Sequence, residues 1–168
     1  MQNLSSVPEQ EVIIIAAMSE NRVIGRNNVM PWLIKEEMAH FTKLTKGWPC
    51  IMGRKTWESL PKKPLPGRLN IVVSQALAAD SLQDAAIFPS LPDAVEYCAS
   101  YEKTFICGGE AIYRQALALA NKIELTLIHR EYQGDTFFPE VDTAFWVETK
   151  TVRFDTFSFI TYTKTSAF

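Results

Sequence analysis

Continuous apolar runs recur along this chain at intervals that are typical of buried strands. The first is VIIIAAM (Val12 to Met18), which is rich in β-branched residues and has the length of one strand. Similar runs lie at 50–52, 69–74, 104–107 and 123–129. Strands covered on both faces have this continuous apolar character. These segments therefore predict the inner strands of a sheet with both faces covered.

Amphipathic segments with helical spacing lie between several of these runs. They cover residues 33–45, 54–60, 92–100 and 110–120. Strands that alternate with helices predict an α/β domain whose central sheet is mostly parallel. Residues 144–154 and 156–165 instead alternate like two strands joined by a short turn, which predicts an antiparallel hairpin at the end of the sheet. The sheet is therefore expected to be mixed.

Length and composition indicate one globular domain. A chain of 168 residues with 47% hydrophobic residues can bury a single substantial core. No apolar run approaches the roughly 20 residues that span a bilayer. The formal net charge is −2 with both signs interspersed, so no broad basic field for nucleic acid is expected. The polar N-terminal sequence lacks the features of a secretory signal, and we expect a flexible arm over 1–10 and the domain over 11–168.

The three cysteines, Cys50, Cys98 and Cys107, are odd in number and lack a close CxxC spacing. Two of them lie inside apolar runs. We therefore expect reduced, buried thiols in a cytoplasmic protein, and no metal site.

One acidic residue lies inside the apolar stripe of the helix expected over 33–45. At 100° per residue the stripe contains Leu33, Ile34, Met38, Phe41 and Leu44. Glu37 falls between Leu33 and Phe41, whereas Glu36 points to the outer face. Desolvating a lone carboxylate costs several kcal/mol in practice, so Glu37 needs a partner or a use. The alternative is that Glu37 lies at the edge of the stripe and its carboxylate reaches water.

In two further segments a predicted strand is followed by glycine and then by the start of a predicted helix. They are CIMGRKTWESL and FICGGEAIYRQAL. Each places glycine-bearing backbone at a helix start beyond a strand, where exposed N–H groups can hold phosphate. Neither matches a dinucleotide fingerprint or a P-loop. Taken alone, Gly108 and Gly109 could form only a tight turn, and Arg54 and Lys55 could be solvated surface residues.

With these segments in view, the chain resembles the dihydrofolate reductase family along 12–164. The matching pieces are the helix bearing Glu37 and Phe41, together with IIIAAMSENRVIGRNNVMPW, IMGRKTWESL, PLPGRLNIVVS, FICGGEAIY and LTLIHREYQGDTFFP. The resemblance implies a single α/β domain with an eight-stranded, mixed and mostly parallel sheet flanked by four helices. It also implies NADPH-dependent reduction of 7,8-dihydrofolate to tetrahydrofolate, with hydride to C6 and a proton to N5, in support of one-carbon metabolism.

The resemblance assigns a substrate site. Glu37 matches the acid that binds the amino-pyrimidine edge of the pterin, and Arg68 matches the cation that pairs with the glutamate tail. Catalytic roles are implied for Glu37, Trp32, Thr126 and Tyr113. The other substrate contacts implied by the match are Ile15, Ala17, Met38, Phe41, Leu60, Leu65, Cys107 and Thr126, although several of these could be ordinary core residues.

The resemblance also assigns a cofactor site for NADPH. Arg54 and Lys55 match the cations that meet the adenosine 2′-phosphate and neighbouring phosphate oxygens. A cis peptide is implied between Gly108 and Gly109, and a mobile loop at Met30 to Trp32 is braced by 134–139. The full set of implied cofactor contacts is Ala17, Ile24, Gly25, Met30, Arg54, Lys55, Thr56, Ser74, Gln75, Gly108, Gly109, Glu110, Ala111, Ile112 and Tyr113.

The chain departs from the family pattern at several positions. Ala111 and Gln75 stand where some members carry residues that contact the 2′-phosphate, so the phosphate grip is expected to depend more on Arg54 and Lys55. Cys107 stands where Ile, Val or Leu is usual. Antifolate inhibitors are expected ligands, and a monomer is expected. Two alternatives stay open, a pyrimidine reductase of riboflavin synthesis on the same fold and a noncatalytic nucleotide- or folate-binding module.

Overall fold

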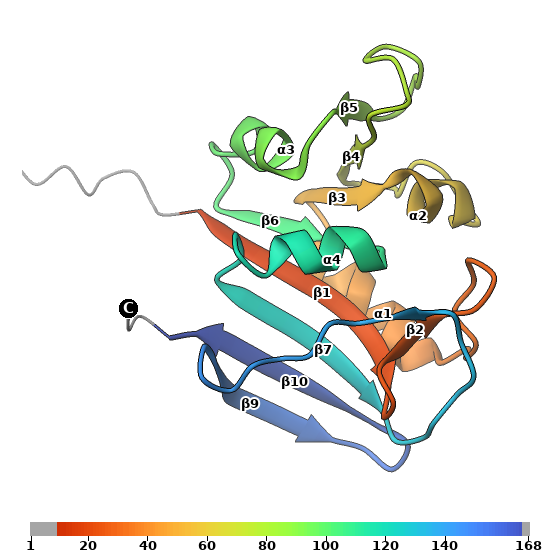
Figure 1. Ribbon diagram of the computed structural model, residues 1–168, viewed down its shortest axis with the longest axis vertical. Helices are drawn as coiled ribbons and strands as arrows, with labels where there is room; N and C mark the ends of the chain where they lie inside the picture. The colour runs from red at the N-terminus through yellow and green to blue at the C-terminus, as the bar shows by residue number, and fades with distance from the viewer. Residues whose placement is uncertain (1–9, 166–168) are drawn as a thin grey trace, which may run out of the picture.

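The computed structural model describes residues 10–165, and its centre is an eight-stranded sheet (Figure 1). The strand order is β5-β4-β3-β6-β1-β7-β10-β9. The strands are β1 (Glu11–Ser19), β3 (Pro49–Gly53), β4 (Leu69–Val73), β5 (Ala86–Phe88), β6 (Lys103–Ile106), β7 (Lys122–Ile128), β9 (Trp146–Arg153) and β10 (Phe157–Lys164). A separate two-stranded sheet pairs β2 (Val23–Gly25) with β8 (Thr136–Phe137).

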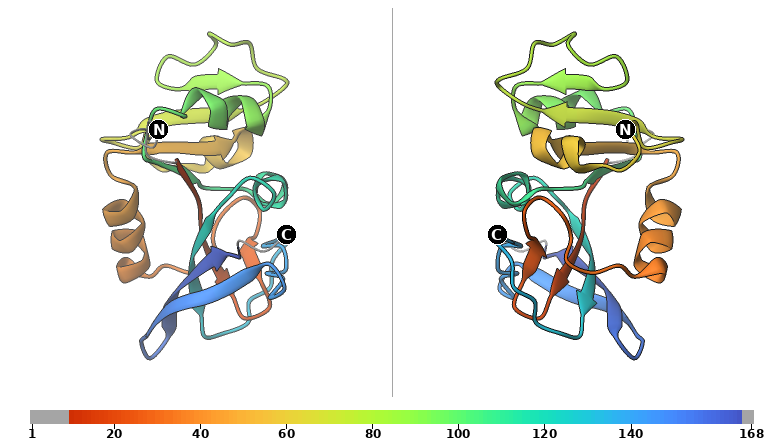
Figure 2. Two further views of the ribbon diagram at one scale, coloured as in Figure 1. Left: turned by 90° about the vertical axis from the view of Figure 1, so that its left-hand side faces the viewer. Right: turned by 90° about the vertical axis from the view of Figure 1, so that its right-hand side faces the viewer.

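Helices cover both faces of this sheet, as the alternation of strands and helices predicted. They are α1 (Lys35–Thr45), α2 (Arg54–Ser59), α3 (Leu91–Tyr97) and α4 (Glu110–Ala116). Residues of α1 and α2 pack on one face with Ile13, Ile15 and Phe105, while residues of α3 and α4 pack on the other with Ile14 and Ile106. Figure 2 shows α1 and α4 on opposite sides of the sheet.

The strand directions confirm the mixed sheet. All pairs from β5 through β7 are parallel, whereas β10 runs antiparallel to both β7 and β9. The buried inner strands are the continuous apolar runs seen in the sequence, and β9 and β10 form the predicted C-terminal hairpin. The fold class expected from the sequence is therefore confirmed.

Several element boundaries differ from the prediction. α1 begins at Lys35 instead of residue 33, because Ile34 is extended, with φ −126° and ψ 113°. α3 covers Leu91–Tyr97 instead of 92–100, and its start is fixed by the Ser90 side chain, which accepts a hydrogen bond from the backbone N–H of Asp93. α2 and α4 end at Ser59 and Ala116, earlier than predicted. Three short strands, β2, β5 and β8, were not predicted.

The apolar stripe predicted on α1 was wrong at two positions. The side chains of Leu33 and Met38 are 83% and 48% exposed. Leu33 precedes the helix, so helical spacing does not apply to it. Phe41 and Leu44 do pack in the core that contains Ile13 and Ile15. The buried stripe is therefore narrower than the sequence pattern indicated.

The arm expected over 1–10 lies outside the described residues except for Gln10. The side-chain amide of Gln10 donates to the carbonyl of Cys98 and to the hydroxyl of Thr104, both at 2.9 Å. These two bonds attach the start of β1 to β6 and to the end of α3. Across residues 10–165, none of the helices combines the length and apolar character needed to cross a membrane.

Candidate active site

A gap in the sheet opens along one edge of β1. β1 pairs with β6 only as far as Ile14 and Ile106, whereas its pairing with β7 continues to Ser19 and Ile128. From Ile15 onward, one edge of β1 is therefore not paired with β6. Open α/β sheets bind ligands at such a point, beyond the carboxyl ends of the strands. Ile15 and Ala17 lie on this part of β1, and Tyr113 bonds to the carbonyl of Ile15.

Glu37 is the half-buried acid at this opening. It lies one turn before Phe41 on α1, and Phe41 packs against the core that includes Ile15. Burial raises the pKa of Glu37 from 4.5 to about 7. No hydrogen bond from a residue of the described chain reaches its carboxylate, and no direct bond joins it to the buried Thr126, which pairs with Ala17 across β7 and β1. The carboxylate is thus available to a ligand.

Tyr113 lies near enough to feel the charges of both Glu37 and Cys107. Tyr113 is buried on α4, and its hydroxyl donates to the carbonyl of Ile15 at 2.7 Å. Burial, followed by the charges of Cys107 and Glu37, raises the pKa of Tyr113 well above its usual value. Hydrogen bonding with the Cys50 thiol, and then burial, raises the pKa of Cys107. These groups are neutral near pH 7, so Glu37 is the titrating group among them.

Arg68 lies at the other end of α1 and is held by two hydrogen bonds. Its Nε donates to the carbonyl of Pro66 at 2.8 Å, and one terminal nitrogen donates to the hydroxyl of Thr45 at 3.0 Å. The guanidinium lies 5.8 Å from the centre of the Phe41 ring. Its remaining N–H groups can meet a carboxylate. Sequence reasoning missed Thr45, whose position two helical turns after Glu37 was the available signal.

The remaining substrate residues form apolar walls. Leu60, Leu65 and Cys107 are half-buried and pack against the core of Ile15 and Cys50. Met38 is the exception, because its side chain is half exposed. Trp32 is buried beside Ala17, and its indole N–H is the one buried side-chain polar atom without a partner in residues 10–165. That N–H can donate to a ligand or to water.

The two glycine turns predicted to hold phosphate lie against each other. The backbone N–H of Gly53 donates to the carbonyl of Gly108 at 2.8 Å. A Cβ at Gly109 would lie 3.3 Å from the hydroxyl of Thr56. The peptide between Gly108 and Gly109 is cis, as predicted. The starts of α2 and α4 therefore face one common space, which fits a pyrophosphate approached closely by backbone.

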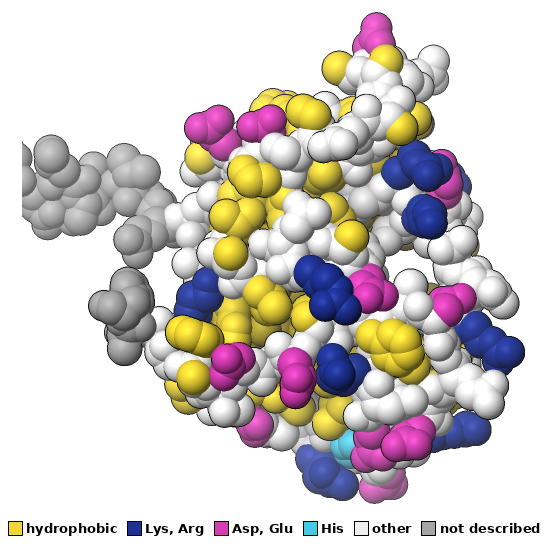
Figure 3. All heavy atoms as spheres, viewed as in Figure 1, with side chains coloured by type: hydrophobic (Ala, Val, Ile, Leu, Met, Phe, Trp, Pro, Cys, Tyr) yellow, Lys and Arg dark blue, Asp and Glu magenta, His cyan; other side chains and the backbone are white. Residues whose placement is uncertain are grey.

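The cations beside these turns lie on α2. Arg54 pairs with Glu58 at 2.9 Å, and Lys55 is exposed. Figure 3 shows Lys and Arg side chains gathered with one acidic group over this helix. Farther along, the Ser74 hydroxyl accepts from the backbone N–H groups of Ala76 and Leu77, while Gln75 is exposed. Arg54 must therefore share its charge between Glu58 and any bound phosphate.

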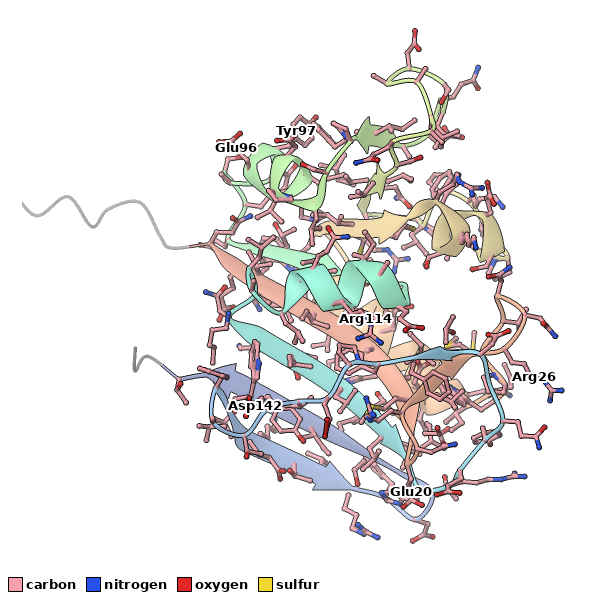
Figure 4. The ribbon with its side chains drawn as sticks, in the orientation of Figure 1. Glu20, Arg26, Glu96, Tyr97, Arg114 and Asp142 are labelled. Atoms are coloured by element: carbon pink, nitrogen blue, oxygen red, sulfur yellow. The ribbon has the colours of Figure 1, made fainter. Side chains whose placement is uncertain are left out.

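The start of α4 contributes through backbone more than through side chains. The Glu110 carboxylate accepts from the backbone N–H of Phe137 at 3.0 Å and pairs at 2.8 Å with Arg114. These bonds, that to Arg114 first, lower the pKa of Glu110. Figure 4 labels Arg114 on α4. Ala111 is exposed and Ile112 is buried. The Glu110 side chain thus holds β8 to α4.

β2 and the loop that follows it contact β8 and the segment before it. Ile24 and Gly25 lie on β2, and a Cβ on Gly25 would lie 2.7 Å from the hydroxyl of Thr136 on β8. The backbone N–H of Asn27 donates to the Asp135 carboxylate at 3.0 Å. Met30 is 46% exposed at the outer part of this loop. The 134–137 segment therefore contacts the loop directly, as expected for a brace.

Comparisons with known proteins point to one enzyme family. The family model described as dihydrofolate reductase matches residues 11–164. A dihydrofolate reductase of Neisseria gonorrhoeae is 49% identical over 138 residues, which is 82% of this chain and 85% of that protein. That of Bacillus subtilis is 40% identical over 135 residues, covering 80% and 79%. A structure of the Enterococcus faecalis enzyme complexed with NADP(H) and RAB-propyl matches with a TM-score of 0.85 and 28% identity, covering 94% and 98% of the two chains.

Proposed function

Because the chain belongs to the dihydrofolate reductase family, and so reduces dihydrofolate with NADPH, we propose that Glu37 is its pterin-binding acid. Glu37 accepts two N–H bonds from the amino-pyrimidine edge of the pterin. A charge-assisted, bidentate arrangement of this kind is a strong interaction and accounts for an acid on a half-buried helix face. Family membership also removes the two alternatives left open by the sequence, a pyrimidine reductase and a noncatalytic binding module.

When bound, the nicotinamide cofactor supplies the hydride that goes to C6 of the pterin. The protein's own groups orient the substrate and supply the proton that goes to N5. Glu37 is the one group near the pterin whose pKa lies close to neutrality, which suits proton donation at physiological pH. We assign it two successive states: its ionised form accepts the two pterin N–H bonds, and it then takes up a proton from solvent, which a water carries to N5. The Trp32 N–H and the Thr126 hydroxyl orient that water and the pterin.

The remaining residues divide between the two ligands. The two adjoining glycine turns and Thr56 receive the pyrophosphate of NADPH, and Arg54 and Lys55 receive its 2′-phosphate. Ala17, Ile24 and Tyr113 line the nicotinamide end. Arg68 binds the glutamate tail of the substrate, and Phe41, Leu60 and Leu65 form the walls between the two charged ends.

The observation that carries this proposal is the state of the Glu37 carboxylate. Burial raises its pKa to about 7, and within residues 10–165 it has no hydrogen-bond donor of its own. Partial burial disfavours the ionised carboxylate although water still reaches it, and N–H groups of a ligand would favour that ionised form. The adjacent Glu36 is exposed, so water satisfies its carboxylate.

Glutamine substitutions at the two neighbouring glutamates, Glu36 and Glu37, test the assignment. Glu37→Gln keeps the size of the side chain but removes its charge and its proton, so we expect turnover at neutral pH to fall by orders of magnitude and dihydrofolate binding to weaken. NADPH binding should survive. Lower pH should restore part of the rate, because solvent then protonates the substrate directly. Glu36→Gln is the matched control and should retain normal activity; a damaging Glu36→Gln or a fully active Glu37→Gln contradicts the proposal.

We also propose that the protein acts as a monomer in the cytoplasm. Its three cysteines are free thiols, as is usual in a reducing compartment. The edge strand β9 carries Glu148, Lys150 and Arg153, and charged side chains on an edge strand disfavour pairing with a second copy. Sedimentation equilibrium of the purified protein tests the oligomeric state.

A further inference from the structure

A second cation, Lys46, follows the end of α1 and contacts the loop that carries Arg68. Lys46 follows the helix, and its Cγ lies 3.9 Å from where a Cβ on Gly67 would be. Gly67 is the residue before Arg68. Within residues 10–165, neither Lys46 nor Arg68 forms an ion pair with an acidic side chain. The protein thus presents two cations without acidic partners of their own.

Hydrogen bonds join the backbone that carries Lys46 to the loop that carries Arg68. The backbone N–H of Trp48 donates to the carbonyl of Thr45, and Gly47, at φ +87°, completes the turn after α1. The backbone N–H of Gly47 donates to the carbonyl of Gly67 at 2.9 Å. The same Thr45 hydroxyl that accepts from Arg68 donates to the carbonyl of Phe41 at 2.7 Å. The end of α1 and the 66–68 loop are therefore one unit.

We propose that Lys46 is the second cation of the tail site and determines specificity for a dicarboxylate. The glutamate tail of the substrate has two carboxylates, and this inference relies on the proposed role of Arg68 as the partner of one of them. The planar guanidinium of Arg68 takes the α-carboxylate bidentately. The exposed Lys46 ammonium, on a longer and freer stem, takes the γ-carboxylate at the tip of the tail.

The local charge supports an anionic ligand at this place. Between 43 and 68 the chain has seven Lys or Arg residues and one acid, Glu58, which is paired with Arg54 on α2. No acidic residue of that segment therefore competes for Lys46. The contribution of a solvent-exposed ion pair to binding is modest, however, and typically changes a binding constant by about two- to five-fold. The effect of Lys46 is thus expected on specificity more than on total affinity.

Binding of two ligands tests the proposal. One is dihydrofolate, and the other is an analogue in which 2-aminobutyrate replaces the tail glutamate, so that only the α-carboxylate remains. The wild-type protein should bind dihydrofolate about two- to five-fold more tightly than the analogue. Lys46→Gln should reduce this ratio to near one without changing the Kd of the analogue, and Lys46→Arg should keep the ratio. Raising the salt concentration should reduce the ratio in the wild-type protein.

Lys43→Gln is the matched control on the same helix. Lys43 lies two residues after Phe41, roughly 200° around the axis, and its charge instead acts on His40. Lys43→Gln should therefore leave the ratio of affinities for dihydrofolate and the analogue unchanged. A ratio that survives Lys46→Gln, or equal weakening of both ligands, overturns the assignment of Lys46.

A separate measurement identifies a failure of the proposed function. Arg68→Leu should weaken both tail-bearing ligands but not a reduced pterin that lacks the tail. If Arg68→Leu weakens the tail-less pterin equally, Arg68 is not a tail-binding residue, whatever Lys46 does. If Arg68→Leu behaves as expected while Lys46→Gln leaves the ratio intact, only the inference about Lys46 fails.

Discussion

At the scale of single residues, Glu37 connects the stability of the protein to its function. Its carboxylate is half-buried without a protein donor, and burial raises its pKa from 4.5 to about 7. A raised carboxyl pKa means that the folded state favours the protonated form more than the unfolded state does. The ionised form, which we propose binds the pterin, is therefore costly to the protein without its ligand.

This cost predicts a pH dependence of unfolding. Below about pH 4.5 the Glu37 carboxyl group is protonated in the folded and the unfolded state, so it does not change the free energy of unfolding. Between pH 4.5 and about 7 only the unfolded state ionises, so the free energy of unfolding falls as the pH rises. Above about pH 7 both states are ionised and the free energy of unfolding falls no further. The shift corresponds to an upper bound of roughly 3 kcal/mol. Ligand-free Glu37→Gln should therefore gain stability relative to wild type as the pH rises from 4.5 to 8, measured by urea unfolding. Glu36→Gln should follow the wild-type curve, and a Glu37→Gln curve parallel to that of the wild type would contradict burial of an ionisable Glu37 as the cause.

Residue patterns separated the environments of Glu37 and Glu36 but did not reveal the bonds that other candidate site residues make. Helical spacing distinguished Glu37 from Glu36, and the structure agrees that Glu36 is exposed. Spacing could not reveal that Thr45 holds Arg68, because that bond joins residues 23 positions apart. It also could not foresee the pairing of Arg54 with Glu58, since a cation next to a helix start fits both a phosphate and an acid one turn away.

At the scale of elements, buried strands were predicted well and short ones were not. β1, β3, β4, β6 and β7 follow from their apolar runs because burial on both faces leaves a continuous pattern. β2 and β8 have three and two residues, too few to show any period, and they depend on each other for pairing. These two strands also flank the loop that contains Met30, to which we assign cofactor contacts. The part of the fold that is hardest to predict thus includes part of the proposed cofactor site.

Contact between β2 and the segment before β8 predicts the effect of a small substitution. A Cβ on Gly134 would lie 2.3 Å from a side-chain carbon of Val23 and 2.6 Å from the carbonyl of Gly25. Gly134→Ala should therefore separate this segment from β2 and displace the loop that contains Met30. We expect turnover to fall about ten-fold or more, while the thermal midpoint changes by a few degrees. Gln133→Ala, at the exposed neighbouring position, is the control, and equal turnover in both variants would show that the segments tolerate the shift.

At the scale of the whole molecule, charge is distributed unevenly. Seven of the 17 cationic residues and one of the 19 acidic residues lie between 43 and 68, so this segment has a net charge of +6 and the remainder has −8. The segment runs from the last turns of α1 through α2 to the start of β4, and it contains Arg54, Lys55 and Arg68, to which we assign ligand contacts. NADPH and dihydrofolate are both anionic. A cationic surface on an acidic protein concentrates such ligands at the one place where they bind.

Electrostatic steering of this kind predicts a kinetic effect without a contact. Lys62 is exposed in the loop between α2 and β4 and has no hydrogen bond or ion pair within residues 10–165. Lys62→Glu should lower the association rate constants of NADPH and dihydrofolate by about two- to three-fold at low salt and leave their dissociation rate constants unchanged. The difference should vanish near 1 M salt, where the Debye length is about 3 Å.

Arg153→Glu makes the same charge change on β9, at the opposite end of the sheet, and should leave both association rates unaltered. Stopped-flow tryptophan fluorescence measures all four constants, and a change confined to dissociation would mean that Lys62 touches the ligands instead of steering them.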